Sequence, residues 1–281
     1  MTQLSDTQLL EYIREDIPYF DLTTHLLDLP SQEMSLSIFT RDEIVTACTE
    51  ESARMATLLG CSVMAFVPSK TLLKSGETLL EIQGNHENIH QAWRVCQMFL
   101  EHACGIATQA KKMQESVQSV NQHCEVLVTR KSFPFSKHFT IRALLCGGVL
   151  PHRLGLSESI LIFGQHRALY SDKESFAVAM RELKTRCIEK KLVIESESLE
   201  DAKEMLHLGA DVIQIDKCGV DTLCELVAYK NKYFKHVTII AAGGINLSNV
   251  VEFAGTGING IVTSSLYQAK MADLSSKIGI L

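Results

Sequence analysis

Short apolar runs recur at regular intervals through the second half of the chain. Six of them have the length of β-strands, at 125–129, 160–163, 192–196, 211–216, 237–242 and 260–264. Most are separated by segments with helical periodicity, for example residues 199–209. Repeated strand–helix units predict a parallel sheet, and short buried strands with polar carboxyl ends favour a β/α barrel. Six strands are fewer than the eight of a closed barrel, so the pattern alone does not establish closure.

The first part of the chain has a different pattern. Between residues 34 and 83, strand-like segments surround one helical stretch at 49–60. This mixture predicts a small α+β unit, preceded by a short helix at 6–17. A long helical stretch follows from about 85 to 120, and its Gly105 predicts a break or a change of direction.

Composition narrows the class of protein. The chain has 281 residues, of which 46% are hydrophobic and 21% charged, as expected for a folded globular protein. A net charge of −6 argues against nucleic acid as the main partner. The nine cysteines are odd in number and form no CxxC, which favours a reducing compartment. Without a basic-then-apolar leader or an apolar run near the ~20 residues of a membrane span, we expect a soluble cytoplasmic protein.

Glycines and hydroxyl side chains follow the last two predicted strands. The segments are AAGGINLSN at 241–249 and VTSSL at 262–266. β/α barrels often bind phosphate in these two loops. Gly243 and Gly244 let the backbone approach a ligand closely, and Asn246 or Ser248 can cap the next helix. The alternative is a plain turn with a helix cap.

A basic run lies between residues 126 and 171. It contains one acid, Glu158, and six cations: Arg130, Lys131, Lys137, Arg142, Arg153 and Arg167. Arg130 and Lys131 directly follow the strand at 125–129, which predicts a position on the loop face of the barrel. Concentrated positive charge in an acidic chain predicts an anionic ligand. The alternative is a solvated basic surface.

Acidic residues end two neighbouring predicted strands. Glu195 and Glu197 alternate at the end of 192–196, and Asp216 ends the strand at 211–216. At a shared mouth, Glu197 and Asp216 could together bind Mg²⁺ that is bridged to a substrate diphosphate. The alternative is that these acids only cap helices. A different motif, HExxH at 86–90, matches a zinc-protease pattern, but no third ligand follows at the expected spacing, so we interpret it as a polar helix start.

In order along the chain, these residues resemble the quinolinate (nicotinate-nucleotide pyrophosphorylase) phosphoribosyltransferase family. The segment EDIPYFDLTT (15–24) is similar to the family's EDxxxGDxTT, and RVCQMFLEHACGIAT (94–108) to its RxxLNFLQRxSGIAT. Further along, TRKSFP (129–134) is similar to TRKTxP and HRLGL (152–156) to HRxGL. ESLEDA (197–202), Asp216 and GGI (243–245) follow in the same order. The likeness spans nearly the whole chain.

The resemblance implies an α/β fold: an N-terminal α/β sandwich (1–108) packed on an incomplete parallel β/α barrel (109–281), with C-terminal helices returning to the first domain. It also implies a homodimer or larger homo-oligomer, and Mg²⁺ with phosphoribosyl pyrophosphate as co-substrate. By motif position, Lys131, Glu197 and Asp216 are the expected catalytic residues, and Glu197 and Asp216 the expected metal ligands. The expected acceptor-binding residues are Arg94, Arg130, Lys131, His152, Arg153 and Phe163, with Arg94 reaching a neighbouring subunit's site. The expected phosphate-binding residues are Gly243, Gly244, Ser264 and Ser265.

Departures from the family pattern concern the substrate. Where the family has LIKDNH, this chain has LIFGQH (161–166), so Phe163 stands for a lysine and Gly164 for an aspartate. Ala242 also departs from the family's Glu-x-Ser before the glycines. These features are closer to a branch of the family, the molybdenum transport protein ModD, a pyrophosphorylase by name.

The function implied is therefore a pentosyltransferase (EC 2.4.2.-). It would transfer ribose phosphate from phosphoribosyl pyrophosphate to an acidic, nitrogen-containing acceptor, with a link to molybdenum transport. Quinolinate carries two carboxylates, and with Phe163 in place of a lysine we expect it to be a poor substrate. Two alternatives remain open: a genuine quinolinate phosphoribosyltransferase of NAD biosynthesis, and a non-catalytic sensor of phosphate metabolites or oxyanions.

Overall fold

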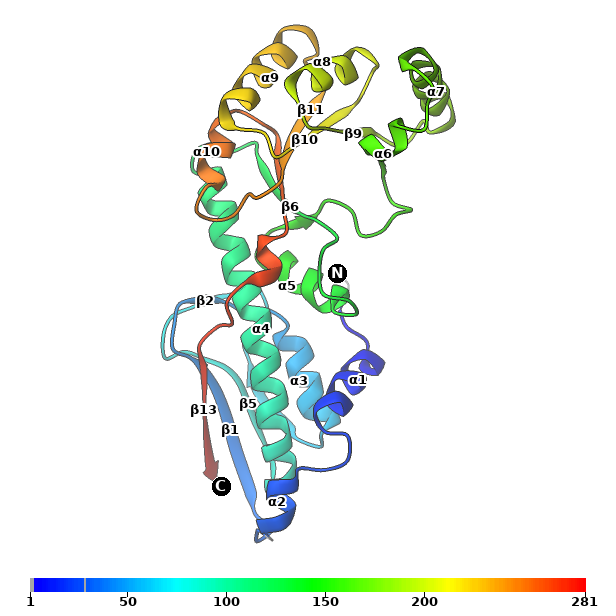
Figure 1. Ribbon diagram of the computed structural model, residues 1–281. Helices are drawn as coiled ribbons and strands as arrows, with labels where there is room; N and C mark the ends of the chain where they lie inside the picture. The colour runs from blue at the N-terminus through cyan, green and yellow to red at the C-terminus, as the bar shows by residue number, and fades with distance from the viewer. Residues whose placement is uncertain (1–2, 28) are drawn as a thin grey trace. The chain divides into compact units, whose positions relative to one another are not determined.

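The computed structural model describes residues 3–27 and 29–281 and divides the chain into two compact units (Figure 1). The first unit contains the chain up to residue 111, together with 132–148 and 267–281. The second contains 112–131 and 149–266. No helix in the described ranges is both long and apolar enough to cross a membrane.

The first unit is built on an antiparallel sheet in the order β13-β1-β5-β3. Its strands are β1 (Glu33–Thr40), β3 (Ser62–Phe66), β5 (Thr78–Asn85) and β13 (Leu274–Ile280), and a second small sheet pairs β2 (Ile44–Val45) with β4 (Leu72–Leu73). The helices are α1 (Asp6–Asp16), α2 (Leu22–Leu27), α3 (Thr49–Leu58), α4 (His86–Gln118) and α5 (Lys137–Cys146). Leu36 and Ile38 alternate with less buried residues along β1, so one face of the sheet is the core face. The strand and helix pattern predicted between 34 and 83 is confirmed.

Two expectations about this unit are wrong. Helix α4 runs from His86 to Gln118 without the break expected at Gly105. A β-carbon on Gly105 would lie 2.3 Å from the carbonyl oxygen of Lys270. The glycine is therefore needed for the close approach of the 270–272 backbone, not for a bend. The segment that returns to this unit from the C-terminal part is a strand, β13, and not the expected helices.

The second unit is a curled parallel sheet of seven strands in the order β7-β6-β12-β11-β10-β9-β8. The strands are β6 (Glu125–Val128), β7 (Leu150–Pro151), β8 (Ile160–Ile162), β9 (Leu192–Ser196), β10 (Val212–Asp216), β11 (Thr238–Ala242) and β12 (Gly260–Thr263). The helices are α6 (Gly164–Arg167), α7 (Lys173–Arg186), α8 (Leu199–His207), α9 (Val220–Tyr233) and α10 (Val250–Gly255), and the short η1 (Ser265–Gln268) leads out of the unit. Because β7 and β8 stand at opposite ends of the strand order, the barrel is incomplete. All six predicted strands are present, and the two-residue β7 is the one that the pattern missed.

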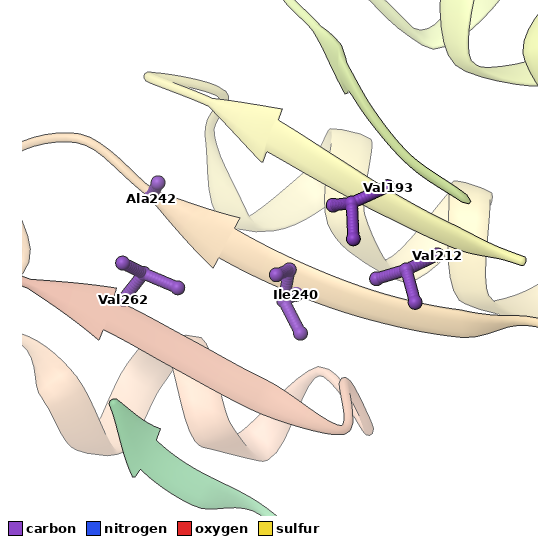
Figure 2. Close-up of a cluster of buried hydrophobic side chains, with 5 residues drawn as sticks. All are labelled: Val193, Val212, Ile240, Ala242 and Val262. Atoms are coloured by element: carbon purple, nitrogen blue, oxygen red, sulfur yellow. The ribbon is translucent and has the colours of Figure 1, made fainter. Parts of the chain in front are cut away.

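The interior of the curled sheet is an apolar cluster from successive strands (Figure 2). Its members alternate with residues such as Ile194 and Ile213, which are fully buried on the opposite face. Leu127 and Leu161 pack against it from β6 and β8. The cluster consists of Val193, Val212, Ile240, Ala242 and Val262. It forms a floor beneath the carboxyl ends of the strands, where β/α barrels carry their sites.

Candidate active site

Acidic and amide side chains follow the interior cluster along two neighbouring strands. Side chains two residues apart share a face of a strand, so Val193 is followed on the inner face by Glu195, and Val212 by Gln214 and Asp216. Gln214 stands opposite Glu195 in the β9–β10 register. The polar groups therefore begin one step above the apolar floor and continue to the carboxyl edge of the sheet.

Glu195 lies at the centre of these groups. Its carboxylate Oε2 accepts a hydrogen bond of 2.8 Å from Gln214 Nε2. Burial raises the pKa of the Glu195 carboxyl, and the charges of Asp216 and Glu197 raise it further, whereas Gln214 and Lys131 oppose the shift. The side chains of Lys131, Glu197 and Asp216 thus lie within electrostatic reach of one carboxylate. Of the three expected catalytic residues, Lys131 follows β6, Glu197 follows β9 and Asp216 is the last residue of β10.

Three basic residues cluster at the ends of β6 and β7. Arg153 is buried, with only 9% of its surface exposed. Among the described residues, no acidic side chain forms an ion pair with it. Burial and the neighbouring Arg130 lower the pKa of Arg153. Burial and Arg153 lower the pKa of His152. Mutual repulsion of this kind marks an excess of positive charge that an anionic ligand would offset.

Other cations of the basic run do not belong to this cluster, which corrects the interpretation of the run as one anion site. Arg142 lies in the first unit, where its guanidinium bonds Glu51 at 3.0 Å and Glu50 at 3.1 Å. Arg167 bonds both oxygens of Asp201, at 2.6 and 3.0 Å. These two arginines are held by acids far along the chain, which a count over a sequence window cannot reveal. Lys137 begins α5 of the first unit.

Phe163 stands beside the basic cluster at the end of β8. Its half-buried ring lies 5.9 Å from the Arg153 guanidinium carbon, within the range of a cation–π contact. The ring also stacks with His166 at 5.8 Å between centroids. The backbone N–H of Phe163 donates to His166 Nδ1 at 3.0 Å. An aromatic surface therefore occupies this strand end.

The glycine loop after β11 passes close to Asp216. Gly243 has φ of +93°, and a β-carbon there would lie 2.7 Å from the backbone nitrogen of Lys217 and 2.9 Å from Asp216 Oδ1. Gly244 has φ of +71° and open space around its Cα. Only glycine fits the first position, because both the backbone conformation and the space exclude a side chain.

The cap of the helix after this loop differs from the expectation. The N-cap residue of α10 is Asn249, not Asn246 or Ser248. Asn246 instead accepts hydrogen bonds at its Oδ1 from the backbone N–H of Ser248 at 2.9 Å and from its hydroxyl at 2.6 Å. The amide nitrogens of Asn246 and Asn249 both donate to the Gly244 carbonyl at 3.3 Å. Turns in which an Asn side chain bonds a nearby backbone group are an alternative to capping of the following helix by that side chain.

Thr263 joins the two candidate phosphate loops and was not singled out from the sequence. Its buried hydroxyl donates to the carbonyl of Ile245 at 2.6 Å and accepts from the backbone N–H of Ser265 at 3.0 Å. This fixes the loop after β11 against the loop after β12. Ser264 and Ser265 are partly exposed beside it. In the sequence, the run of hydroxyl residues in VTSS was the signal that could have pointed to Thr263.

The remaining sequence candidates lie in the first unit. Arg94 is exposed on α4, with its guanidinium carbon 5.1 Å from the Trp93 ring centroid. In the HExxH segment, His90 Nδ1 donates to the His86 carbonyl at 2.7 Å. Within residues 3–27 and 29–281, no three His, Cys, Asp or Glu side chains group as a metal site.

Known proteins resemble this chain over its whole length. The model of the quinolinate phosphoribosyl transferase N-terminal domain matches residues 21–104, and that of the C-terminal domain matches residues 106–277. "Putative pyrophosphorylase ModD" of Pasteurella multocida is 32% identical over 98% of this chain and 97% of its own. The protein of the same name from Rhodobacter capsulatus is 34% identical over 92% of this chain and 98% of its own.

More distant relatives have a different name. A "probable nicotinate-nucleotide pyrophosphorylase [carboxylating]" of Methanothermobacter thermautotrophicus is 28% identical over 95% of this chain and 96% of its own. The crystal structure of NadC from Streptococcus pyogenes has a TM-score of 0.87 at 26% identity, and each chain covers 100% of the other. Both family domains and the full-length relatives agree, and the chain therefore belongs to the quinolinate phosphoribosyltransferase family.

Proposed function

We propose that this protein transfers ribose phosphate from phosphoribosyl pyrophosphate to an acidic, nitrogen-containing acceptor, as a pentosyltransferase (EC 2.4.2.-). The observation that carries the proposal is the grouping of Lys131, Glu197 and Asp216 around Glu195 at the mouth of the second unit. A family fold with only a structural role would not need acidic residues and a lysine at the carboxyl ends of β6, β9 and β10. Such a grouping costs free energy unless a bound ligand offsets it.

The basic cluster suits the acceptor. The guanidinium groups of Arg130 and Arg153 present planar pairs of N–H donors, which match a carboxylate. His152, with its lowered pKa, is neutral near pH 7 and donates one further hydrogen bond. These residues, with Lys131, would bind the acceptor and orient its ring nitrogen toward the ribose carbon.

The acidic residues suit Mg²⁺ bound together with a diphosphate. Mg²⁺ is usually held by one or two carboxylates, with waters and substrate phosphates completing its shell. Glu197 and Asp216 supply two such carboxylates at the ends of the neighbouring strands β9 and β10. When bound, the ion would neutralise the departing pyrophosphate. The protein's own contribution is to hold both substrates in line, and no covalent intermediate is needed.

The loops after β11 and β12 suit the 5-phosphate of the ribose. Gly243 and Gly244 contribute backbone from one loop, and Ser264 and Ser265 add hydroxyls from the other. Thr263 fixes the distance between the two loops. A preformed cradle of this type binds phosphate without reorganising the backbone.

Phe163 bears on the identity of the acceptor. Its ring, beside Arg153, replaces a cation with an apolar surface, which favours an acceptor less anionic than quinolinate. Relatives at 32% and 34% identity are named as ModD pyrophosphorylases, which supports this branch. With the branch we propose a link to molybdenum transport. The relative at 28% identity, named as a nicotinate-nucleotide pyrophosphorylase, keeps quinolinate as the alternative acceptor.

We also propose a homodimer or larger homo-oligomer that acts in the cytoplasm. Arg94 is exposed and has no acidic partner among the described residues, so it is available to a neighbouring subunit's site. All nine cysteines are free thiols, which agrees with a reducing compartment.

The test of the enzymatic proposal is calorimetric titration with phosphoribosyl pyrophosphate, with and without Mg²⁺, on the wild-type protein and on Glu197→Gln. We expect binding that requires Mg²⁺ and is weakened by the substitution, because the metal links the diphosphate to the carboxylate. Glu200→Gln removes the same charge from an exposed position on α8 and serves as the control. Metal-independent binding that Glu197→Gln leaves unchanged would indicate a sensor of phosphate metabolites instead.

A further inference from the structure

A glutamine lies inside the apolar interior of the second unit. Gln214 is two residues beyond Val212, which belongs to the cluster in Figure 2, and it is only 6% exposed. Its Nε2 donates to Glu195, but its Oε1 is buried and has no hydrogen-bond partner among the residues that the structure describes. An unpaired buried amide oxygen costs free energy, and an apolar side chain of similar length would avoid that cost. Packing alone therefore does not explain a glutamine here.

Gln214 and Glu195 share one transverse row of the sheet, and Phe163 directly follows the neighbouring strand β8. The register pairs Leu161 with Val193, and Val193 with Val212. Two residues further along, Glu195 pairs with Gln214, whereas Phe163 follows Ile162, the last residue of β8, which stands opposite Ile194. Glu195 thus stands on β9, between the strand that carries Gln214 and the strand that ends just before Phe163.

One oxygen of Glu195 is held and the other is available. Oε2 accepts from Gln214, whereas Oε1 receives no hydrogen bond from any residue in the described part of the chain. The side chain is partly exposed, so the available oxygen can accept from a ligand in the mouth. Gln214 fixes the orientation of this carboxylate. The free energy lost by burying the glutamine amide is what the protein loses to hold Glu195 in that orientation.

We propose that Glu195, positioned by Gln214, selects an acceptor that carries a neutral hydrogen-bond donor on the edge next to Phe163, where quinolinate carries its second carboxylate. The inference rests on the proposed function and extends it by defining the acceptor. A carboxylate beside an apolar ring repels an anionic substituent and accepts from an amino, hydroxyl or ring N–H group. Glu195 is then a specificity residue and Gln214 a positioning residue.

Ribose hydroxyls carry the same donor chemistry, so the experiment must separate them from the acceptor. Calorimetry would measure the affinities of nicotinate, quinolinate and 2-aminonicotinate, and separately of phosphoribosyl pyrophosphate with Mg²⁺. The proteins are the wild type, Glu195→Gln and Gln214→Met, with Glu200→Gln as the control for charge on an exposed residue of the same unit. Urea unfolding of Gln214→Met reports its stability.

We expect the wild type to bind 2-aminonicotinate about tenfold or more tightly than either other pyridine, as one charge-assisted hydrogen bond would give. Glu195→Gln should reduce this preference by about tenfold, and Gln214→Met should reduce it in the same direction while the protein remains at least as stable as the wild type. Phosphoribosyl pyrophosphate should bind Gln214→Met and Glu200→Gln as tightly as it binds the wild type.

Several results would overturn the inference. They are equal affinity of the wild type for the three pyridines, no measurable binding of any pyridine, or an unchanged preference in both variants. Weakened binding of phosphoribosyl pyrophosphate in the variants, with the pyridines unaffected, would assign the pair to the ribose instead. Failure of the wild type to bind phosphoribosyl pyrophosphate at all would count against the proposed function rather than against this inference alone.

Discussion

The Arg142 guanidinium donates from Nε to Glu51 Oε1 at 3.0 Å, and the two side chains are only 4% and 0% exposed. A second bond of 3.1 Å joins Arg142 to Glu50. Sequence separates this arginine from the two glutamates by about ninety residues. The pair therefore ties α5 to α3 inside the first unit.

Arg142→Met should destabilise the protein by about 3–5 kcal/mol, because it leaves a buried carboxylate without its partner. Urea unfolding of the wild type and the variant measures the difference. Arg41→Met is the control, since Arg41 and Asp273 form an exposed pair at 3.5 Å with 59% and 54% of the side chains accessible. The control should change stability by no more than about 1 kcal/mol. Equal effects in both variants would contradict a structural role for Arg142.

Phe163→Lys should make quinolinate a better substrate. Restoring a cation beside a buried carboxylate is worth roughly 2–5 kcal/mol, or about thirtyfold to several thousandfold in kcat/KM. The measurement is formation of nicotinate mononucleotide and CO₂ from quinolinate and phosphoribosyl pyrophosphate with Mg²⁺. Phe163→Leu, which stays apolar, is the matched control. Wild-type turnover near the ~10 s⁻¹ typical of enzymes would instead identify an ordinary quinolinate phosphoribosyltransferase.

Gly243→Ala should weaken binding of phosphoribosyl pyrophosphate by at least about tenfold. The new β-carbon would lie 2.7 Å from the Lys217 nitrogen in a backbone with φ of +93°, so the loop has to move. Strain of this kind also costs about 1–3 kcal/mol of stability. Gly164→Ala is the control. A β-carbon at this position would have no other atom within 4 Å, and the backbone φ there is not positive. Wild-type affinity in Gly243→Ala would exclude this loop from the phosphate site.

His152 should make the protein less stable in mild acid. Burial and Arg153 hold its native pKa below the ordinary value of 6.5, so the unfolded chain takes up the proton first as the pH falls. Stability should therefore decrease as the pH falls from about 6.5 through the native pKa, and His152→Gln should lose less. Urea unfolding at pH 7.5 and 5.5 tests this, with the exposed His123→Gln as the matched histidine substitution. An identical loss in the wild type and His152→Gln would refute it.

Arg94→Ala and Lys131→Ala should each abolish most activity, and a mixture of the two variants should recover part of it. Recovery is expected because one mixed oligomer would contain an intact site with Arg94 from one subunit and Lys131 from the other. Activity assays on the mixture and light scattering on the wild type are the measurements. A stable, active monomer would reject the proposal.

The strands of the second unit could be predicted because they are buried on both faces and therefore appear as short apolar runs. The same logic missed β7, which is two residues long, ends in Pro151 and has an exposed Leu150. At the candidate site, Arg130 and Lys131 follow β6 and Asp216 ends β10, where the strand pattern placed them. The partners of Arg142 and the role of Gly105 depend on residues distant in the chain, so no local pattern could reveal them.

Gln214 illustrates a further limit. In the sequence it is one polar residue inside an apolar run and could have been solvent-facing. Only the register opposite Glu195 and the burial of its amide distinguish it as part of the interior. Similarly, Thr263 becomes recognisable as the residue that joins two loops only when Ile245 lies beside it.

The pairing of β1 with β13 has a consequence for biosynthesis. Thr40 pairs with Leu274 and Met34 with Ile280, so every residue of the second unit is translated between the two strands. At ribosomal speeds of ~5–20 residues per second, β1 would wait roughly 10–50 s for its neighbour. Until then β1 is an open edge next to β5, able to recruit a strand from another nascent chain. The first unit is thus the first to begin synthesis and the last to be completed. The yield of folded protein in cells should depend on chaperones that cover the open edge of β1.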